Sequence, residues 1–460
     1  MPPRRSIANL RPMTTASRNT TLLDARVPRY TSYPPANRFT DAVGAETAAD
    51  WMAAISPDAR VSLYAHIPFC RRLCWFCACR TQGTRSDAPL HRYLDHLEDE
   101  LALVRGLLPE GVRADAIHLG GGTPTILPGE LLSRLGNGLR EAVPPTEDAE
   151  ISVEIDPCEI DAPRLDALAA MGLTRASIGV QDFDPVVQDA IGRHQGAEVT
   201  AATVEGLRAR NVNSLNVDLL YGLPHQTVAR LISTLERVLD LAPDRIALYG
   251  YAHVPWMARR QKLIPEAALP DGEARIVLNQ TARELLTRNG YVPVGIDHYA
   301  LPHDKMAVAA RTGKLRRNFQ GYTTDRADTL IGLGASAISR FPGGYAQNAP
   351  ATGAWQERIA ARRLATTRGY VLTDEDRACG AIIERLMCDG VADIPALCAA
   401  EGVSPVPYLH RARRAISELP DIASLEDGRL AVTSFAYVRI VAARIDGLSM
   451  SGKGRYSMAS

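Results

Sequence analysis

Short apolar runs alternate with longer amphipathic segments over most of this chain. The run VSLYAHI at 61–67 is rich in β-branched and aromatic residues and ends before Pro68, which is typical of a buried strand. In segments such as 91–108 and 227–241 the apolar residues recur at three- and four-residue steps, a period that predicts helices. Similar apolar runs predict further strands at 114–120, 149–156, 175–180, 214–222, 245–252 and 291–297.

Strands that alternate with helices form βαβ units, which build a parallel sheet. Six or seven such units predict an α/β fold, an open or complete barrel whose active-site residues lie at the carboxyl ends of the strands. Cys70 follows the first predicted strand and the glycine run 120–122 follows the second. The next three strands end near Glu154, Gln181 and Asp218. We therefore expect these features on one face of the barrel.

The chain outside this alternation has a different pattern. Near the N-terminus the string PRYTSYPP predicts an extended arm that lies on another surface. After residue 300 the sequence is irregular, basic at its centre and then glycine-rich, which is typical of loops and turns. From about residue 371 it becomes helical around a hairpin-like stretch, ASLEDGRLAVT. The pattern predicts four parts: a tail and arm at 1–58, a barrel core at 59–300, a segment closing the barrel over its pocket at 301–370, and a small helical C-terminal domain at 371–460.

Composition narrows the function classes. Lysine plus arginine equals aspartate plus glutamate at 52 each, and this formal net charge of +0 argues against a broad nucleic-acid-binding surface. No apolar run approaches the roughly 20 residues that span a bilayer, and the N-terminus lacks the hydrophobic core of a signal peptide. The first 25 residues are rich in Arg, Ser and Thr, as in a transit peptide, but a disordered tail is the favoured interpretation. We expect a cytoplasmic protein without a membrane span or a nucleic-acid partner.

The cysteines carry the clearest chemistry. A single tight cluster in a cytoplasmic chain indicates metal ligation rather than a disulfide framework. Cys70, Cys74 and Cys77 have the spacing Cys-x3-Cys-x2-Cys, so one short loop can wrap all three around an iron–sulfur cluster. Such clusters normally have four cysteine ligands. Three ligands predict a [4Fe-4S] cluster with one iron left open for a small molecule.

A fourth thiol, Cys79, follows closely. Only one residue separates it from Cys77, which would strain two ligands on different irons of one cube, so we predict that Cys79 is not a ligand. The alternative is a four-thiolate zinc site. Zinc sites usually pair two Cys-x2-Cys knuckles at a distance, and this sequence has no second knuckle.

These strings resemble a known family. The cysteine spacing with the aromatic Phe76 is similar to the signature of the radical S-adenosylmethionine (SAM) superfamily. YAHIPFCRRLCWFCAC, together with PRYTSYP, GGGTPT, VEIDP, GVQDFD, NVDLLYGLP, NFQGYTT and YAQN, resembles the oxygen-independent coproporphyrinogen III oxidases over residues 28–348. The resemblance implies an open α/β barrel of the radical SAM type, one [4Fe-4S] cluster and bound SAM.

The resemblance also implies SAM ligands. Three glycines after a strand let the backbone approach a ligand closely. The implied contacts of the first SAM are Tyr64, Phe76, Gly121, Gly122, Thr123, Glu154, Ala252 and Ile338, and those of a second SAM are Gln181, Arg193 and Asp218. Other interpretations remain open: Tyr64 as a packing residue, Glu154 as a solvated strand end, and Arg193 in an ordinary salt bridge.

The implied substrate, coproporphyrinogen III, has four propionates and therefore needs cations and hydrogen-bond donors. Candidate contacts are Arg29, Tyr30, Tyr33, Cys79, Arg316, Arg317 and Gln320, although the Arg316–Arg317 pair also suits a solvated surface. The implied reaction is oxidative decarboxylation of two propionates to vinyl groups by a 5′-deoxyadenosyl radical. An electron donor such as flavodoxin or ferredoxin and a monomeric chain are further expectations.

Two rivals share the cluster motif. The first is a haem-binding carrier without oxidase activity, a branch that has Phe at the position of Cys79 and lacks both the N-terminal arm and the NFQGYTT segment. The second is a radical SAM enzyme of haem degradation or methyl transfer. Cys79 and the arm favour the oxidase branch over the carrier.

Overall fold

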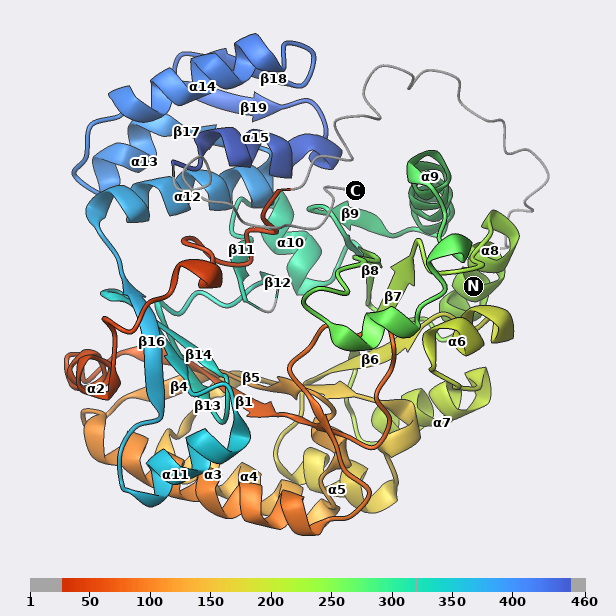
Figure 1. Ribbon diagram of the computed structural model, residues 1–460, viewed down its shortest axis with the longest axis vertical. Helices are drawn as coiled ribbons and strands as arrows, with labels where there is room; N and C mark the ends of the chain where they lie inside the picture. Colours follow the sequence, from red (N-terminus) through yellow and green to blue (C-terminus); the bar gives the residue numbers. More distant parts are fainter. Residues whose placement is uncertain (1–26, 320, 448–460) are drawn as a thin grey trace.

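The computed structural model describes residues 27–319 and 321–447 of the chain. Among these residues the main sheet has twelve strands in the order β16-β15-β14-β13-β1-β4-β5-β6-β7-β8-β10-β9. The strands from β13 to β8 run parallel to their neighbours, and those at both edges are antiparallel. The two edge strands, β16 and β9, do not pair with each other. The predicted α/β fold with an open barrel is therefore confirmed (Figure 1).

The sequence pattern located most of the parallel strands. Those predicted are β1 (Arg60–Ile67), β4 (Arg113–Gly121), β5 (Pro145–Ile155), β6 (Arg175–Gln181), β7 (Ser214–Tyr221) and β8 (Arg245–Gly250). The rest of the sheet consists of β9 (Val292–Val294), β10 (His298–Ala300), β13 (Thr329–Leu333), β14 (Ile338–Phe341), β15 (Gly344–Asn348) and β16 (Thr366–Val371). Short strands outside it are β2 (Phe69–Cys70), β3 (Gln82–Gly83), β11 (Arg316–Asn318) and β12 (Gly321–Thr323).

Two predictions about the sheet were wrong. The strand expected at 291–297 is the short edge strand β9, antiparallel to β10 and centred on Pro293, whose missing N–H suits an edge. The strand position on the other side of β1 belongs instead to β13, in a stretch expected to be loops and turns. Its Gly332 misled the prediction: a Cβ there would lie 2.6 Å from the carbonyl oxygen of Ile338, so this glycine permits close strand packing rather than a turn.

Helices cover the outer face of the sheet (Figure 1). In α3 (Ala88–Leu107) the buried residues Leu90, Leu94, Leu97 and Leu101 follow each other at steps of three and four, so one stripe of the helix packs on the strands. The other helices of this part are α2 (Ala45–Ala53), α4 (Gly129–Ala142), α5 (Ala162–Ala170), α6 (Pro185–Ile191), α7 (Ala197–Arg208), α8 (Val228–Asp240), α9 (Gly272–Arg288), α10 (Lys305–Arg311) and α11 (Thr352–Ala360).

A smaller helical unit lies beside the barrel, drawn in blue in Figure 1. It contains α12 (Asp374–Asp389), α13 (Ile394–Ala400), α14 (Val406–Glu418) and α15 (Val438–Ile445), with β17 (Val391–Asp393), β18 (Ala423–Glu426) and β19 (Arg429–Val432). The expected hairpin is present as β18–β19. Val27 and Tyr30 of the N-terminal arm are buried in the core of this unit, so the arm ties it to the barrel. Within the described residues, no helix is both long and apolar enough to cross a membrane.

Candidate active site

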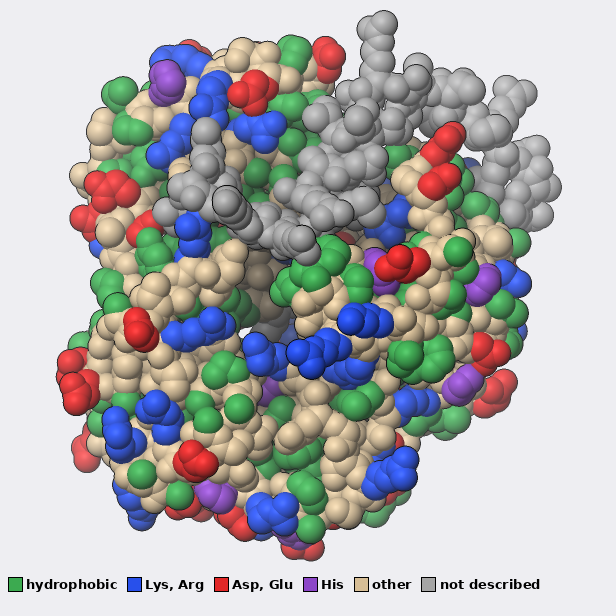
Figure 2. Space-filling view, in the orientation of Figure 1, with side chains coloured by type: hydrophobic (Ala, Val, Ile, Leu, Met, Phe, Trp, Pro, Cys, Tyr) green, Lys and Arg blue, Asp and Glu red, His purple; other side chains and the backbone are tan. Residues whose placement is uncertain are grey.

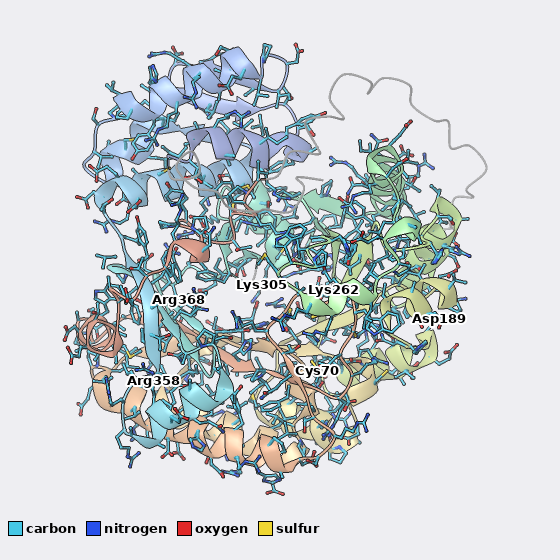
Figure 3. The ribbon with its side chains drawn as sticks, in the orientation of Figure 1. Cys70, Asp189, Lys262, Lys305, Arg358 and Arg368 are labelled. Atoms are coloured by element: carbon cyan, nitrogen blue, oxygen red, sulfur yellow. The ribbon has the colours of Figure 1, made fainter. Side chains whose placement is uncertain are left out.

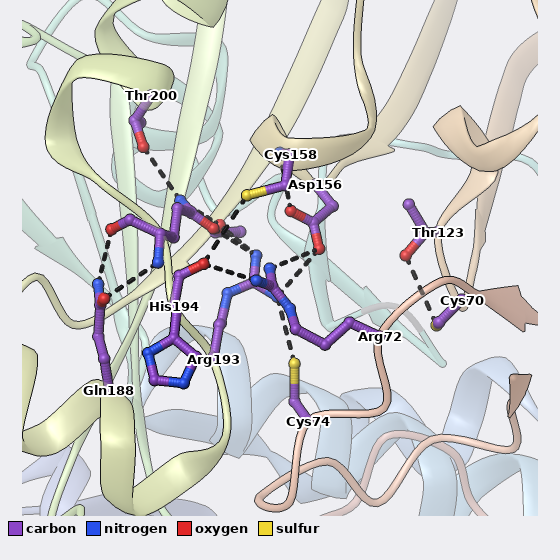
Figure 4. Close-up of polar contacts among 12 residues, drawn as sticks. Cys70, Arg72, Cys74, Thr123, Asp156, Cys158, Gln188, Arg193, His194 and Thr200 are labelled. Carbon is purple, nitrogen blue, oxygen red and sulfur yellow. Dashed lines mark hydrogen bonds and ion pairs between the residues drawn. The ribbon is translucent and has the colours of Figure 1, made fainter. Parts of the chain in front are cut away.

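The cysteine loop leaves the carboxyl end of β1 and each of its three motif thiols accepts a hydrogen bond. Thr123 Oγ1 donates to Cys70 Sγ at 3.5 Å, and Arg193 Nη1 donates to Cys74 Sγ at 3.6 Å (Figure 4). The backbone N–H of Cys79 donates to Cys77 Sγ at 3.4 Å. Three different segments therefore support the three sulfurs, as expected for thiolates that must carry negative charge toward a metal cluster.

The ionisation of these thiols differs with their surroundings. Burial raises the pKa of Cys70 to about 11. Hydrogen bonding to Cys79, helped by the positive charges of Arg260 and Arg193, lowers the pKa of Cys77 to about 6, although burial opposes this. The described residues contain no group of three His, Cys, Asp and Glu side chains placed to hold a single metal ion.

Gly120, Gly121 and Gly122 lie directly against the cysteine loop. A Cβ on Gly122 would lie 2.5 Å from the carbonyl oxygen of Phe69 and 3.0 Å from Cys70 Sγ, and Gly121 has a φ of +116°, which side chains rarely adopt. The loop and the glycine segment are joined by two backbone hydrogen bonds, Gly122 N–H to Ile67 (2.8 Å) and Thr123 N–H to Phe69 (2.9 Å). This cradle admits a ligand next to the sulfurs only because it lacks side chains.

Glu154 and Tyr64 face the same cradle from β5 and β1. Glu154 Oε2 accepts the Gly121 N–H at 3.1 Å, and its Oε1 lies 3.4 Å from His118 Nε2. Tyr64 stacks on His118, and its hydroxyl lies 2.9 Å from His66 Nδ1. The side chain of Glu154 remains 43% exposed, so the carboxylate still has a free side for a ligand.

Asp218 lies deeper on the inner wall, in β7. It accepts hydrogen bonds from Ser177 Oγ and Asn216 Nδ2, both at 2.8 Å. Burial raises the pKa of Asp218, and the negative charge of Glu154 contributes in the same direction. Gln181, the last residue of β6, has a φ of +72°, which turns the chain at the strand end. Two nearby carboxylates that repel each other favour a ligand with a cationic or donor group between them.

Arg193 is placed differently from the other predicted SAM ligands. It is 7% exposed and lies beneath the cysteine loop, where it also donates to Asp156 Oδ2 at 3.3 Å and to the Gly179 carbonyl at 2.7 Å (Figure 4). Its Nε is buried without a hydrogen-bond partner among the described residues. Arg193 therefore does form a salt bridge, with Asp156, and its Nε is a donor that none of the described residues uses and that a polar ligand could satisfy.

Phe76 and Ala252 are joined by a residue that sequence reasoning missed. Gln261, in a 3-10 turn at Arg259–Leu263, is 1% exposed and donates through Nε2 to the carbonyls of Phe76 (2.7 Å) and Ala252 (3.1 Å). Its neighbour Arg260 donates to the carbonyl of Cys79 at 3.1 Å. A lone glutamine in a basic segment gives no sequence signal for such a bridge. Ile338, the remaining predicted contact, begins β14 beside the carboxyl end of β13.

A cavity of about 730 Å³ opens on the Cys79 side of the loop. Of the predicted substrate contacts, it brings together Cys79, Arg29 and Arg317. Three more arginines line it that the sequence did not reveal, Arg275, Arg283 and Arg439. Arg275 and Arg283 are eight residues apart on α9, with Asn279 halfway, and this helical spacing was the available signal.

The arginines of this cavity are crowded. Burial, together with the positive charges of Arg29 and Arg317, lowers the pKa of Arg439 to about 10. Burial likewise lowers the pKa of Arg29. A carboxylate, Asp297, also lines the cavity; burial opposes its ionisation, but a hydrogen bond from His298 and the charges of Arg317 and Arg29 hold its pKa below the usual value. Cations packed against cations favour a polyanionic ligand.

The other predicted substrate contacts lie in a second cavity of about 650 Å³, between the arm and α12. Tyr33 and Arg316 line it, and Arg316 pairs with Glu384 at 3.0 Å. Tyr30 lines it too, while its hydroxyl donates to Asp446 at 3.0 Å. Arg317 lines both cavities, and Gln320 lies outside the described residues.

Comparisons with known proteins agree with this geometry. A sequence model of the radical SAM superfamily matches residues 64–238. An oxygen-independent coproporphyrinogen III oxidase of Paracoccus denitrificans is 58% identical over 368 residues, covering 80% of this chain and 82% of the relative. An anaerobic coproporphyrinogen III oxidase of Cereibacter sphaeroides is 50% identical over 442 residues, covering 95% and 98%.

A solved structure gives the same result for the fold. The coproporphyrinogen III oxidase of Escherichia coli, described as a radical SAM enzyme, superposes with a TM-score of 0.87 at 36% identity, over 91% of this chain and 97% of that one. The identity and coverage confirm the resemblance first seen in the cysteine loop. The chain belongs to the family of oxygen-independent coproporphyrinogen III oxidases, within the radical SAM superfamily.

Proposed function

We propose that this chain converts two propionate side chains of coproporphyrinogen III to vinyl groups, giving protoporphyrinogen IX in haem biosynthesis. The observation that carries the proposal is the arginine-lined cavity that begins at Cys79, at the end of the cysteine loop. Each propionate loses carbon dioxide, one hydrogen atom from its β-carbon and one electron. The protein contributes orientation and exclusion of water, because no strong general base is required.

The residues present fit the cofactors that the family implies, one [4Fe-4S] cluster and SAM. Cys70, Cys74 and Cys77 would hold the cluster. The cradle would hold SAM through Tyr64, Phe76, Gly121, Gly122, Thr123, Glu154, Ala252 and Ile338. Together the two cofactors supply a 5′-deoxyadenosyl radical that can take a hydrogen atom from carbon.

A second SAM is a further part of the proposal. The leftover Nε donor of Arg193 and the carboxylate of Asp218 suit the carboxylate and ammonium of an amino acid, and Gln181 ends the strand β6. Equilibrium dialysis of radiolabelled SAM tests the stoichiometry. We expect two molecules per chain in the wild type and one in Asp218→Asn; one molecule in both would refute the second site.

Arg29, Arg275, Arg283, Arg317 and Arg439 would bind the propionates, and Cys79 would lie at the reacting end of the cavity. Tyr30, Tyr33 and Arg316 would contact only a group that reaches the second cavity. We also propose a monomer in the cytoplasm that takes electrons from a small carrier protein.

The experiment is anaerobic incubation of the reconstituted protein with SAM, a reductant and coproporphyrinogen III, followed by mass spectrometry. We expect a product that has lost two carbon dioxides and four hydrogens. Stoichiometric haem binding without a vinyl product would instead support the carrier, and a methylated or opened macrocycle would support the second rival.

A further inference from the structure

Two segments that touch each other on the surface are strongly basic. The cysteine loop at 68–86 contains four arginines and no carboxylate, and residues 256–263 contain Arg259, Arg260 and Lys262 and again no carboxylate. They are joined by Arg260, which donates to the Cys79 carbonyl at 3.1 Å and to Thr81 Oγ1 at 2.8 Å. In a chain with a formal net charge of +0 this is a local excess, not a general property.

Much of this charge faces solvent without a counter-ion. Arg71 and Arg72 pair with Asp87 and Asp156. In contrast, four cations of the two segments are exposed and make no ion pair with another described residue: Arg80, Arg85, Arg259 and Lys262. Figure 3 shows Lys262 near the cysteine loop that carries Cys70, and Figure 2 shows Lys and Arg side chains gathered over the middle of the same face.

Apolar side chains stand among these cations. Met257 is 73% exposed and Leu263 is 58% exposed, which makes Met257 the most exposed of the large hydrophobic residues in the described part of the chain. Neither lines the arginine-rich cavity. Exposed apolar groups rimmed by charge are typical of transient protein interfaces, and methionine adapts to differently shaped partners.

The patch also has a short route to the cluster ligands. Gln261, between Arg260 and Lys262, donates to the Phe76 carbonyl at 2.7 Å, and Phe76 lies between Cys74 and Cys77, directly before Cys77. Electron transfer weakens steeply with distance, so a donor that docks here is well placed. None of these exposed cations and apolar side chains lines the substrate cavity, although Arg80 directly follows Cys79, which does.

We propose that Arg80, Arg85, Met257, Arg259, Lys262 and Leu263 form the docking surface for a small acidic one-electron carrier protein. The inference rests on the proposed function, which requires an external electron. One electron leaves the reduced carrier, which is thereby oxidised by one electron, and enters the cluster, which is reduced by one. The cations steer the carrier and the apolar pair holds it briefly.

The test uses the reconstituted holoenzyme without porphyrinogen, and a purified bacterial flavodoxin as the acidic probe. Calorimetry with oxidised flavodoxin measures binding, and stopped-flow absorbance measures cluster reduction by flavodoxin hydroquinone. We expect the double variant Arg259→Glu, Lys262→Glu to lower the bimolecular rate about tenfold or more at low salt and to flatten its salt dependence. Met257→Ser with Leu263→Ser should weaken binding several-fold at all salt concentrations.

Matched controls are Arg105→Glu on the outer side of α3 and Val406→Ser on α14, both exposed. They should behave as the wild type. Reduction by dithionite should be unchanged in every variant, which excludes damage to the cluster. Wild-type binding and rates in the charge-reversal variant would overturn the proposal. The proposal would also be overturned if the apolar variant changed the oligomeric state of the enzyme and left flavodoxin binding unchanged. Dithionite-driven turnover of coproporphyrinogen III tests the proposed function separately.

Discussion

The parallel strands hold a polar cavity at each end, and the charges in the two are arranged in opposite ways. At the amino ends a cavity of about 610 Å³ contains Glu150 paired with Arg175 at 2.8 Å. Nearby, buried Arg245 pairs with Asp304 at 2.7 Å. At the carboxyl ends the carboxylates of Glu154 and Asp218 repel each other, and the arginines on the Cys79 side are crowded together.

The pKa shifts express this difference. For Glu150, burial opposes ionisation, but Arg175, Arg245 and Lys305 together hold the pKa below its usual value. For Asp218, burial raises the pKa and Glu154 adds to the effect. Charge that is balanced within the protein stabilises the fold, whereas like charges held together are left for a ligand to balance. This comparison distinguishes the candidate active site at the carboxyl ends of the strands from the polar cavity at their amino ends, whose charges have a structural role.

The largest expected effect tests the cysteine loop at the carboxyl end. Replacing Cys70, Cys74 or Cys77 by Ser should abolish cluster assembly and SAM cleavage, because each change removes one of the three proposed iron ligands. Cys79→Ser should keep the iron, whatever it does to product formation. Iron and sulfide content and visible absorbance measure this, with exposed Cys158→Ser as the control. Loss of iron from the Cys79 variant would refute its assignment as a non-ligand.

The next effect concerns the crowded arginines. Arg283→Met should raise the KM for coproporphyrinogen III roughly 10- to 100-fold, since a charged hydrogen bond contributes about 1.5–3 kcal/mol. The maximal rate should change little. Arg288→Met, on the same helix but paired with Glu284, is the control for a general effect of charge removal. An unchanged KM in the Arg283 variant would remove the cavity from the substrate site.

A matched pair of acids should shift stability in opposite directions. The raised pKa of Asp218 gives stability below the pKa of the unfolded state that is lost as pH rises through the folded pKa, so Asp218→Asn should raise the melting temperature at pH 7. The lowered pKa of Glu150 gives stability above the unfolded pKa that is lost as pH falls, so Glu150→Gln should lower it.

Thermal unfolding of the two variants between pH 4 and 8 checks these signs. Asp218→Asn should lower the activity although it raises the stability, because Asp218 lies on the inner wall of the site. Glu150→Gln should keep the activity, because Glu150 lies outside the site. If both variants lose stability at pH 7, the contrast between the two ends of the barrel is wrong.

The smallest effect is expected at the amino end. Arg175→Gln removes one partner of a half-buried pair, while Arg245 and Lys305 still offset the charge of Glu150. Stability should fall by about 1 kcal/mol, measured by denaturant unfolding, and turnover should stay at the wild-type level. A clear loss of turnover would give this cavity a role in the reaction.

The sequence predicted those parts of the fold and site that depend on local patterns. Strand β1, the cysteine spacing and the glycine run are each read from consecutive residues, and they were located correctly. Strand β13 was missed because its Gly332 resembles a turn residue in the sequence. The reason for this glycine is a close contact with Ile338, which exists only in the folded sheet. Gln261 was missed for the same reason: its partners, Phe76 and Ala252, come from separate parts of the chain.

The substrate residues were predicted only in part. Arg29 stands in the quoted string PRYTSYP and Arg317 directly precedes NFQGYTT, while Arg275, Arg283 and Arg439 reach the cavity from α9 and from the C-terminal unit. The helical spacing of Arg275 and Arg283 was the one available signal, and Arg439 has none. Their shared position is a result of how the arm and the C-terminal unit pack, which a single sequence without folded contacts does not specify.

The open edge of the sheet has a consequence for how such a protein can change. In a closed barrel the number and tilt of the strands fix the width of the interior. Here β16 and β9 do not pair, and much of the wall of the large cavity comes from the arm, α9 and the C-terminal unit. Mutation, insertion or loss in those walls can therefore alter which molecule enters, while the strands that carry the cysteine loop and the glycine cradle keep their register.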